Sequence, residues 1–134
     1  MRRLMLDTNI CIQILRGKEP EVRRRLEATR RADVAISSVV AGELWTGVMK
    51  SPQRQRHEQA LMDFLAFADV LDWPAEAAPV YAEIRTALEA QGLSIGAMDL
   101  LIAAHALHER ATLVTRNRRE FARVKGLKLE SWGQ

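Results

Sequence analysis

The sequence predicts an α/β fold, in which a mostly parallel central sheet of about four to five strands is flanked by helices. Short apolar runs alternate along the chain with segments of helical spacing, which is typical of right-handed βαβ crossovers. The chain has 134 residues, and 48% of them are hydrophobic and 28% charged, as in ordered globular proteins. This length suits one ordinary domain and is too short for two. We therefore expect a single domain over residues 1–134.

The predicted strands are short and mostly apolar. They are residues 3–6, DVAIS (33–37), VLDW (70–73), TLVT (112–115) and LKLES (127–131). Because helical segments separate them, neighbouring strands are expected to run parallel, with helices on both faces of the sheet.

The helices are expected from apolar spacing and from end signals such as N-cap serines and glycine stops. In the first half of the chain we expect a helix over 8–16 that stops at Gly17, a charged helix from Pro20 to about Arg31, and a helix after DVAIS with Ser38 as its N-cap. In the second half we expect helices over 53–68 and 97–110, and a short one in NRREFARV. Between the first two of these lies a helix that ends at Gly92 and carries the apolar stripe Ala77, Val80, Tyr81, Ile84 and Leu88.

Several classes of protein are disfavoured by the composition. No run of ~18 uncharged apolar residues occurs, so no membrane span is expected. The start MRRLMLDTN lacks the long apolar region of a secretion signal, which favours a cytoplasmic protein. Cys11 is the single cysteine, so it excludes an internal disulfide, and its apolar surroundings favour a buried, inert thiol.

The formal net charge is +3, a modest excess that is compatible with an acidic partner without requiring one. Its distribution is more informative, because the basic residues form two clusters. The first contains Arg23, Arg24, Arg25, Arg30 and Arg31, and the second contains Arg116, Arg118 and Arg119. The first cluster could either be a solvated surface without a ligand or bind an anionic partner, and the sequence leaves both alternatives open.

Three carboxylates each stand alone in an apolar stretch: Asp7 in LMLDTNICIQIL, Glu43 in SSVVAGELWTGVM and Asp99 in SIGAMDLLIAAHAL. Asp7 ends the first strand, and TRN (115–117) ends the fourth. The ends of parallel strands share one edge of a sheet, where ligands bind, so these residues are expected to converge. Three neighbouring acids repel one another, and a divalent cation would relieve that repulsion. Oxygen-only ligation favours Mg²⁺ or Mn²⁺.

Each acid also has a simpler explanation. Asp7 suits an N-cap, Asp99 suits the first turn of its helix, and Glu43 could pair with a basic side chain. Taken together these explanations weaken, because three independent ones must fall at one edge of the sheet. Of the histidines, His105 is expected to be a core residue or a support for a metal ligand, and His57 to be exposed.

LDTN after the first strand, SSVVAGELWTG, IGAMDLLIAAHAL and LVTRNRREFARVKGLKLESW, in this order and spacing, resemble the PIN-domain ribonucleases, and more closely the VapC toxins of bacterial toxin–antitoxin pairs. The resemblance runs from Met5 to Trp132. It implies Mg²⁺-dependent cleavage of RNA by an endoribonuclease that inhibits translation and growth. Some relatives cut initiator tRNA in the anticodon loop, which makes tRNA the first candidate among several structured RNAs.

The same resemblance implies roles for individual residues. The metal-binding carboxylates match Asp7, Glu43 and Asp99. The last motif of the family commonly supplies an acid or asparagine, which falls on Asn117, with Glu120 just beyond. Because Asn117 is neutral, either residue could complete the site, and one or two metal ions are possible. Small polar positions that the family keeps around the acids match Thr8, Asn9, Ser38 and Thr115.

Arg116, Arg118 and Arg119 flank the expected site, where we expect contact with RNA phosphates. The resemblance further implies a homodimer and a higher assembly with a VapB antitoxin, and the lack of a long apolar run means that no membrane partner is expected. The antitoxin's C-terminal segment would place a basic side chain near the acids and compete with the metal.

Three other functions remain open at this point. A PIN nuclease could process RNA as housekeeping, and a co-encoded antitoxin gene would distinguish a toxin from it. A hydrolase of another phosphate, or a phosphoacceptor using Asp7, is disfavoured because MLDTN and TLVTRN lack the adjacent acids and the lysine of receiver domains. A non-catalytic binding module on the same fold would gain by replacing the three acids with neutral residues.

Overall fold

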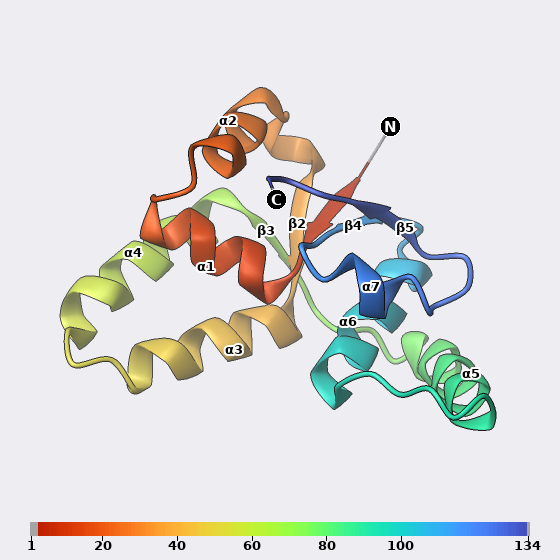
Figure 1. Ribbon diagram of the computed structural model, residues 1–134. Coiled ribbons are helices and arrows are strands. Elements are labelled where there is room, and N and C mark those ends of the chain that lie inside the picture. The colour runs from red at the N-terminus through yellow and green to blue at the C-terminus, as the bar shows by residue number, and fades with distance from the viewer. Residues whose placement is uncertain (1–2, 134) are drawn as a thin grey trace.

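The computed structural model describes residues 3–133 and contains one five-stranded sheet (Figure 1). Its strands are β1 (Leu4–Leu6), β2 (Val34–Ser37), β3 (Asp69–Leu71), β4 (Thr112–Val114) and β5 (Lys128–Glu130). The strand order is β3-β2-β1-β4-β5, and every neighbouring pair is parallel. Leu4 lies opposite Val34 on one side and Thr112 on the other. The predicted α/β class with a parallel sheet is confirmed.

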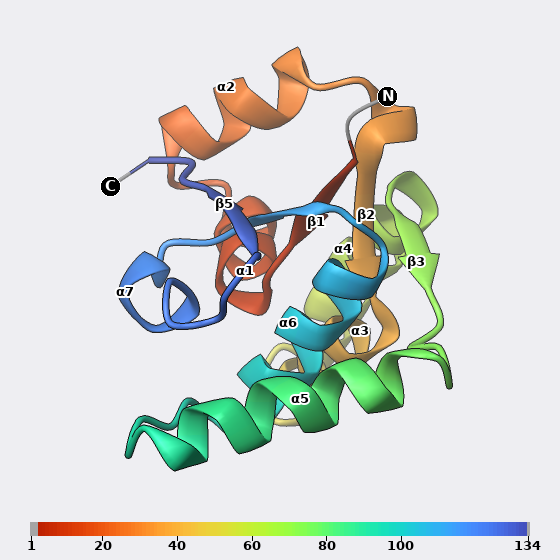
Figure 2. The same ribbon diagram turned by 90° about the vertical axis from the view of Figure 1, so that its right-hand side faces the viewer.

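Helices cover both faces of this sheet. They are α1 (Thr8–Arg16), α2 (Pro20–Ala28), α3 (Ser38–Met49), α4 (Arg54–Phe67), α5 (Ala77–Ala90), α6 (Ala97–His108) and the short α7 (Arg118–Phe121), with a 3₁₀ turn at Arg31–Asp33. Helices α1, α2 and α4 lie on one side of the sheet, and α5 and α6 on the other (Figures 1 and 2). This arrangement follows from right-handed crossovers between parallel strands.

Most predicted helices end within two residues of the observed ends, and the exceptions are α7, which ends at Phe121 and not at Val124, and α2. It was expected to continue to about Arg31 but ends at Ala28, since Thr29 adopts an extended backbone and donates its hydroxyl hydrogen to the Arg25 carbonyl. Gly17 does stop α1, with a φ of 67° and its N–H bonded to the Gln13 carbonyl. Glycine tolerates this left-handed backbone at no steric cost.

The N-cap of α3 is Ser37, so the prediction of Ser38 is wrong. The Ser37 hydroxyl accepts the Val39 N–H at 3.1 Å. The Ser38 hydroxyl instead accepts the backbone N–H of Trp73 at 3.0 Å. Adjacent serines carry the same local signal, and the point where β2 ends decides which of them faces the free N–H groups of the helix.

The core is almost entirely apolar. Every residue of β1 and β2 is buried, and so is Cys11, as predicted. Among residues 3–133, the buried polar side chains are only Asp7, Ser37, His105 and Thr115. Burial of a polar group is costly without a hydrogen-bond partner, so each of these four needs an explanation.

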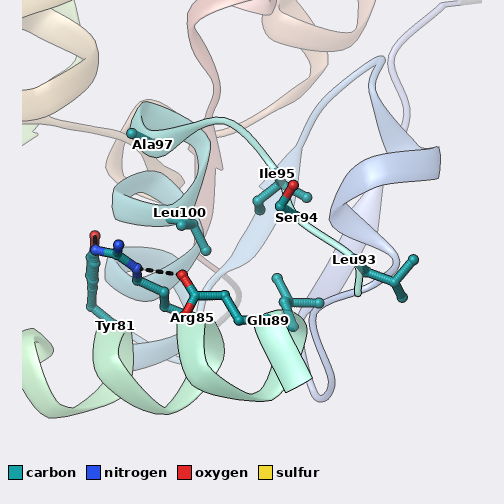
Figure 3. A pocket seen from close by; sticks show the side chains of 9 residues that line it. Tyr81, Arg85, Glu89, Leu93, Ser94, Ile95, Ala97 and Leu100 are labelled. Carbon is teal, nitrogen blue, oxygen red and sulfur yellow. Dashed lines mark hydrogen bonds and ion pairs between the residues drawn. The ribbon is translucent and has the colours of Figure 1, made fainter. Parts of the chain in front are cut away.

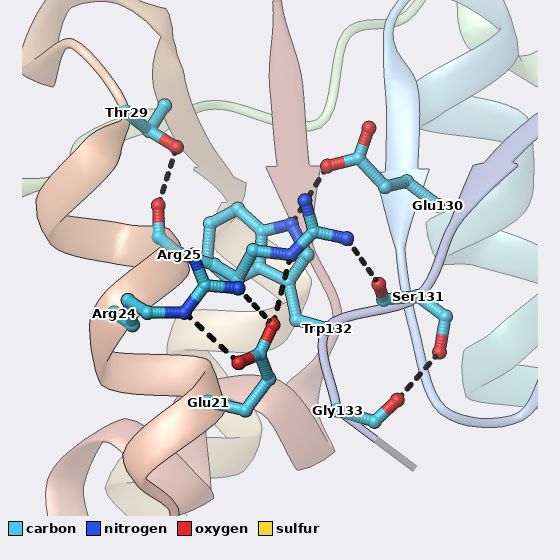
Figure 4. A network of polar contacts seen from close by, with 8 residues as sticks. All are labelled: Glu21, Arg24, Arg25, Thr29, Glu130, Ser131, Trp132 and Gly133. Carbon is cyan, nitrogen blue, oxygen red and sulfur yellow. Dashed lines mark hydrogen bonds and ion pairs between the residues drawn. The ribbon is translucent and has the colours of Figure 1, made fainter.

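The C-terminal segment is held against α2 by polar contacts around a buried tryptophan (Figure 4). The Trp132 indole is 1% exposed, and its N–H donates to the Glu130 carboxylate at 2.7 Å. Arg25 donates to the Ser131 carbonyl at 3.1 Å, and Glu21 forms ion pairs with Arg24 and Arg25. Within the described residues, no helix is long and apolar enough to cross a membrane.

Candidate metal centre

Asp7 lies directly after β1, and its side chain is buried. It is the N-cap of α1: Oδ1 accepts the Ile10 N–H at 2.9 Å, while Oδ2 accepts the Thr115 hydroxyl hydrogen. Burial raises the pKa of Asp7, and the nearby Glu43 raises it further, while the Thr115 and Ile10 hydrogen bonds act in the opposite direction. The capping role considered from the sequence is therefore present, and lone pairs remain on both oxygens.

Glu43 lies in the second turn of α3 and is partly buried. Its Oε1 accepts the hydroxyl hydrogen of Thr8, the first residue of α1, at 2.5 Å. This hydrogen bond joins the two helices that follow β1 and β2. The carboxylate that raises the pKa of Asp7 is thus held by the residue next to Asp7 in the chain.

Asp99 occupies the first turn of α6, and α6 is the element that precedes β4 along the chain. Because α6 runs back along the sheet before β4 begins, its start faces the edge where the strands end. The pKa of Asp99 is raised to about 6, mainly by burial and then by the charges of Glu120, Asp7 and Glu43. Four carboxylates from four segments of the chain therefore share one electrostatic environment.

Asn117 and Glu120, between which the sequence could not choose, lie together at the end of β4. The Asn117 amide donates to Glu120 at 2.5 Å, and the Asn117 N–H donates to the Thr115 hydroxyl oxygen at 2.9 Å. Thr115 thus connects Asn117 to Asp7. The same hydroxyl donates to one partner and accepts from the other, as a serine or threonine can.

None of these four acids forms an ion pair with a lysine, arginine or histidine within residues 3–133. The simpler explanation for Glu43, a basic partner, therefore does not hold. Across the same part of the chain, no three Asp, Glu, His or Cys side chains form a group that could hold a metal by themselves. Mg²⁺ fits such a donor set, because it usually keeps several waters and binds one or two protein carboxylates together with substrate phosphate.

The arginines near the site differ in their surroundings. Arg116 lies 3.4 Å from the carboxylate of Glu19, the N-cap residue of α2, so part of its charge is already compensated. Arg118 and Arg119 are exposed at the start of α7. Phosphate contact stays a prediction for all three, and these two are the better placed for it.

The four small polar residues expected around the acids divide into two groups. Thr8 and Thr115 bond directly to Glu43 and Asp7. Asn9 is exposed and affects Asp7 only through its backbone N–H, while the Ser38 hydroxyl is bonded to Trp73. Ser37, which bonds to the buried His105, was not among the residues expected at the site.

Two hollows of the surface differ in their relation to the acids. One, between α5 and the segment before α6, is lined by Leu93 and Ile95 and contains the Arg85–Glu89 ion pair (Figure 3). None of the four acids lines it. The other is a groove of about 660 Å³ with Ile12, Leu15 and Val48 among its apolar residues, and Glu43 lines it as well.

Comparisons with known proteins identify the family of this chain. Residues 4–127 match the PIN domain family. The chain is 43% identical over 129 residues to ribonuclease VapC2 of Rickettsia felis, which covers 96% of both chains. It is 41% identical over 132 residues to a tRNA(fMet)-specific endonuclease VapC of Shigella flexneri, which covers 98% of this chain and 99% of the relative.

Solved structures of the same family have the same fold as this chain. The crystal structure of VapBC2 from Rickettsia felis bound to promoter DNA superposes with a TM-score of 0.90 at 42% identity, covering 96% of this chain and 98% of that one. DNA-bound VapBC from Salmonella typhimurium has a TM-score of 0.93 at 35% identity, covering 98% and 99%. PIN-domain nucleases generally depend on a divalent metal. By sequence and by fold, the chain belongs to the PIN domain family.

Proposed function

We propose that this protein is an Mg²⁺- or Mn²⁺-dependent endoribonuclease toxin of a VapBC-type pair, which acts in the cytoplasm and inhibits translation by hydrolysing RNA. The observation that carries the proposal is the convergence of Asp7, Glu43, Asp99 and Glu120 at one edge of the sheet with no basic side chain paired to them in residues 3–133. Such a group of acids is destabilising unless a cation joins it.

Asp7 and Asp99 are assigned as the primary metal ligands. Two hydrogen bonds orient the Asp7 carboxylate, and the raised pKa of Asp99 reflects a charge that lacks compensation. Glu43 is assigned as a further ligand or as the base that orients and deprotonates the attacking water. Glu120, held by Asn117, extends the acidic group on the side of β4.

A divalent cation, when bound, would lower the pKa of a coordinated water and neutralise charge that grows on the phosphoryl oxygens. The protein's own contribution is to hold the RNA backbone against an acidic site. Arg118 and Arg119 are assigned to that task, because they are exposed and only one to two residues from Asn117. Initiator tRNA is the first substrate to test, since it is named for the relative from Shigella flexneri.

The groove that begins at Glu43 is proposed as the docking site of a VapB-type antitoxin segment. Its floor is apolar, which suits an amphipathic helix, and Glu43 at its side would attract a basic side chain of that segment. A cation placed there would compete with the metal for the same carboxylates. A homodimer, and a higher assembly with antitoxin, are part of the same proposal, supported by the VapBC complexes among the structural relatives.

A substitution in the groove tests this docking. Gly47 lines it and is exposed, and a Cβ at this position would meet no other atom within 4 Å. We expect Gly47→Leu to weaken binding of the co-encoded antitoxin at least tenfold in calorimetry while Mg²⁺-dependent RNA cleavage is retained. Unchanged antitoxin affinity would place the docking site elsewhere.

The nuclease function is tested by mapping RNA 5′ ends after induced expression of wild type, Asp7→Asn and Asp99→Asn. Wild type should produce new 5′ ends at defined positions, and purified protein should need Mg²⁺ or Mn²⁺ to cut the same RNA. Both variants should fold and lose cleavage, by a factor of at least 10². Asp63→Asn, at an exposed position on α4, is the matched control and should cut normally. Undiminished cutting by well-folded Asp99→Asn would remove Asp99 from the mechanism.

A further inference from the structure

The four buried polar side chains of the described residues form two hydrogen-bonded pairs. Asp7 and Thr115 make the pair at the acidic site. Ser37 and His105 make the other, with the ring Nδ1 2.9 Å from the serine Oγ. The exposed fractions are 1% for Ser37 and 0% for His105. The proposed reaction uses neither residue, so the cost of burying this second pair calls for a role.

Ser37 contacts both the backbone of α3 and the ring of His105. The hydroxyl oxygen already accepts the Val39 N–H at 3.1 Å as the N-cap of α3, which leaves its hydrogen available for Nδ1 of His105. Either the ring Nδ1–H donates to the serine oxygen, or the serine hydroxyl donates to Nδ1 and the neutral imidazole carries its hydrogen on Nε2. That atom is 3.8 Å from the Glu109 carboxylate, too far for a direct hydrogen bond. Burial lowers the pKa of His105, which keeps the ring neutral.

The location of this pair relates it to the acids. Ser37 lies six residues before Glu43, and His105 lies six residues after Asp99. At 1.5 Å per residue, the contact is therefore about 9 Å along each helix from the carboxylate that the helix carries. Helices α3 and α6 pack against each other, and no other hydrogen bond in residues 3–133 joins Ser37 or α3 to α6.

We infer that His105 is a positioning residue: its hydrogen bond to Ser37 holds α6 against the start of α3 and thereby sets the separation of Asp99 and Glu43. Apolar contacts are not directional, whereas a hydrogen bond between two buried groups is restricted in both distance and angle. The inference rests on the proposed metal-dependent function, because the separation of the acids matters only if they share a ligand.

Metal affinity measured without RNA tests this role. The variants are His105→Leu, which removes the hydrogen bond while it fills the space, and His105→Asn, whose amide can occupy the position of Nδ1. Binding of Mn²⁺ to the full-length protein is followed by electron paramagnetic resonance of the free ion. Outer groups that orient metal ligands typically contribute 10–100-fold to affinity. We expect roughly a tenfold loss for His105→Leu, and recovery to within about threefold of wild type for His105→Asn.

A variant that is destabilised far from this contact shows whether a loss of Mn²⁺ affinity comes from lost positioning or only from lower stability. Val22 on α2 is 1% exposed, and Val22→Ala should lower the melting temperature without changing Mn²⁺ affinity. If His105→Leu does not fold, His105→Gln takes its place, because its amide reaches the Nε2 side and leaves Ser37 unpaired. Wild-type affinity in the folded variant, or an equal loss in Val22→Ala, would overturn the inference. Failure of wild type itself to bind Mn²⁺ would overturn the proposed function as well.

Discussion

At Asp99, burial and three neighbouring carboxylates act in the same direction, and they raise the pKa of this side chain to about 6. An ordinary aspartate titrates near pH 4, so the folded protein binds a proton at Asp99 more tightly than the unfolded chain does. The stability that comes from this proton is complete below about pH 4 and is lost as the pH rises through 6. Without metal, the ionised Asp99 therefore destabilises the fold at neutral pH.

Asp99→Asn should remove that cost. In EDTA at pH 7.5 we expect the variant to melt no lower than wild type, with an advantage of about 1 to 2 kcal/mol after allowance for partial exposure to solvent. At pH 4 the advantage should disappear, because the wild-type carboxyl group is then protonated. Urea unfolding at both values of pH measures the difference. A large loss of stability at pH 7.5 would mean that Asp99 serves the structure of α6 and not a ligand.

The acids of the site could be predicted from the sequence, whereas the residues that hold the helices carrying these acids could not. Asp7, Glu43 and Asp99 could be found because each interrupts an apolar stretch, where a charge is costly without a function. The contact between Ser37 and His105 could not, because it joins positions 68 residues apart and depends on how α6 packs. No local pattern distinguishes a histidine with a buried partner from one that only packs.

At the scale of elements, periodicity placed every strand and helix, and it failed at ends that depend on tertiary contacts. The strands were expected one or two residues too long at their ends, as in LKLES (127–131) against the observed β5. The end of α2 depends on Thr29, whose side chain bonds back to the helix. Threonine competes for backbone groups in this way, and helical spacing alone does not reveal it.

The contact of β5 and the C-terminal segment with α2 gives a prediction at this scale. Trp132→Ala should cost about 3–5 kcal/mol of unfolding free energy, because a fully buried indole is replaced by a cavity. Trp132→Phe keeps most of the packing and loses the hydrogen bond to Glu130, so it should cost clearly less. Chemical denaturation of both variants makes the comparison, and equal losses would show that the hydrogen bond dominates.

At the scale of the whole molecule, the net charge of +3 is too small to bring RNA to the site by general attraction. RNA binding must instead depend on where the cations lie. Much of the first arginine cluster is engaged in structure: Arg24 and Arg25 pair with Glu21, and Arg31 donates to the carbonyls of Ala66 and Phe67. Arg118 and Arg119, in contrast, are exposed and lie between Asn117 and Glu120 in the sequence.

Substitution of both Arg118 and Arg119 by alanine should therefore weaken RNA binding and reduce its dependence on salt. With cleavage blocked by Asp99→Asn, the slope of log affinity against log salt should fall by about one for each lost phosphate contact. Arg85→Ala on α5 is the control, because Arg85 is bonded to Glu89 on a different part of the surface. An equal effect in the control would indicate non-specific attraction.

The central claim is that Asp7 and Asp99, with Glu43 beside them, share one hard cation. An anomalous difference map from a crystal soaked in Mn²⁺ tests it most directly. We predict a peak within about 2.0–2.4 Å of carboxylate oxygens of Asp7 and Asp99, the range for oxygen ligands of such ions. A map with no peak between these residues, from protein that still cuts RNA when Mn²⁺ is supplied, would contradict the account.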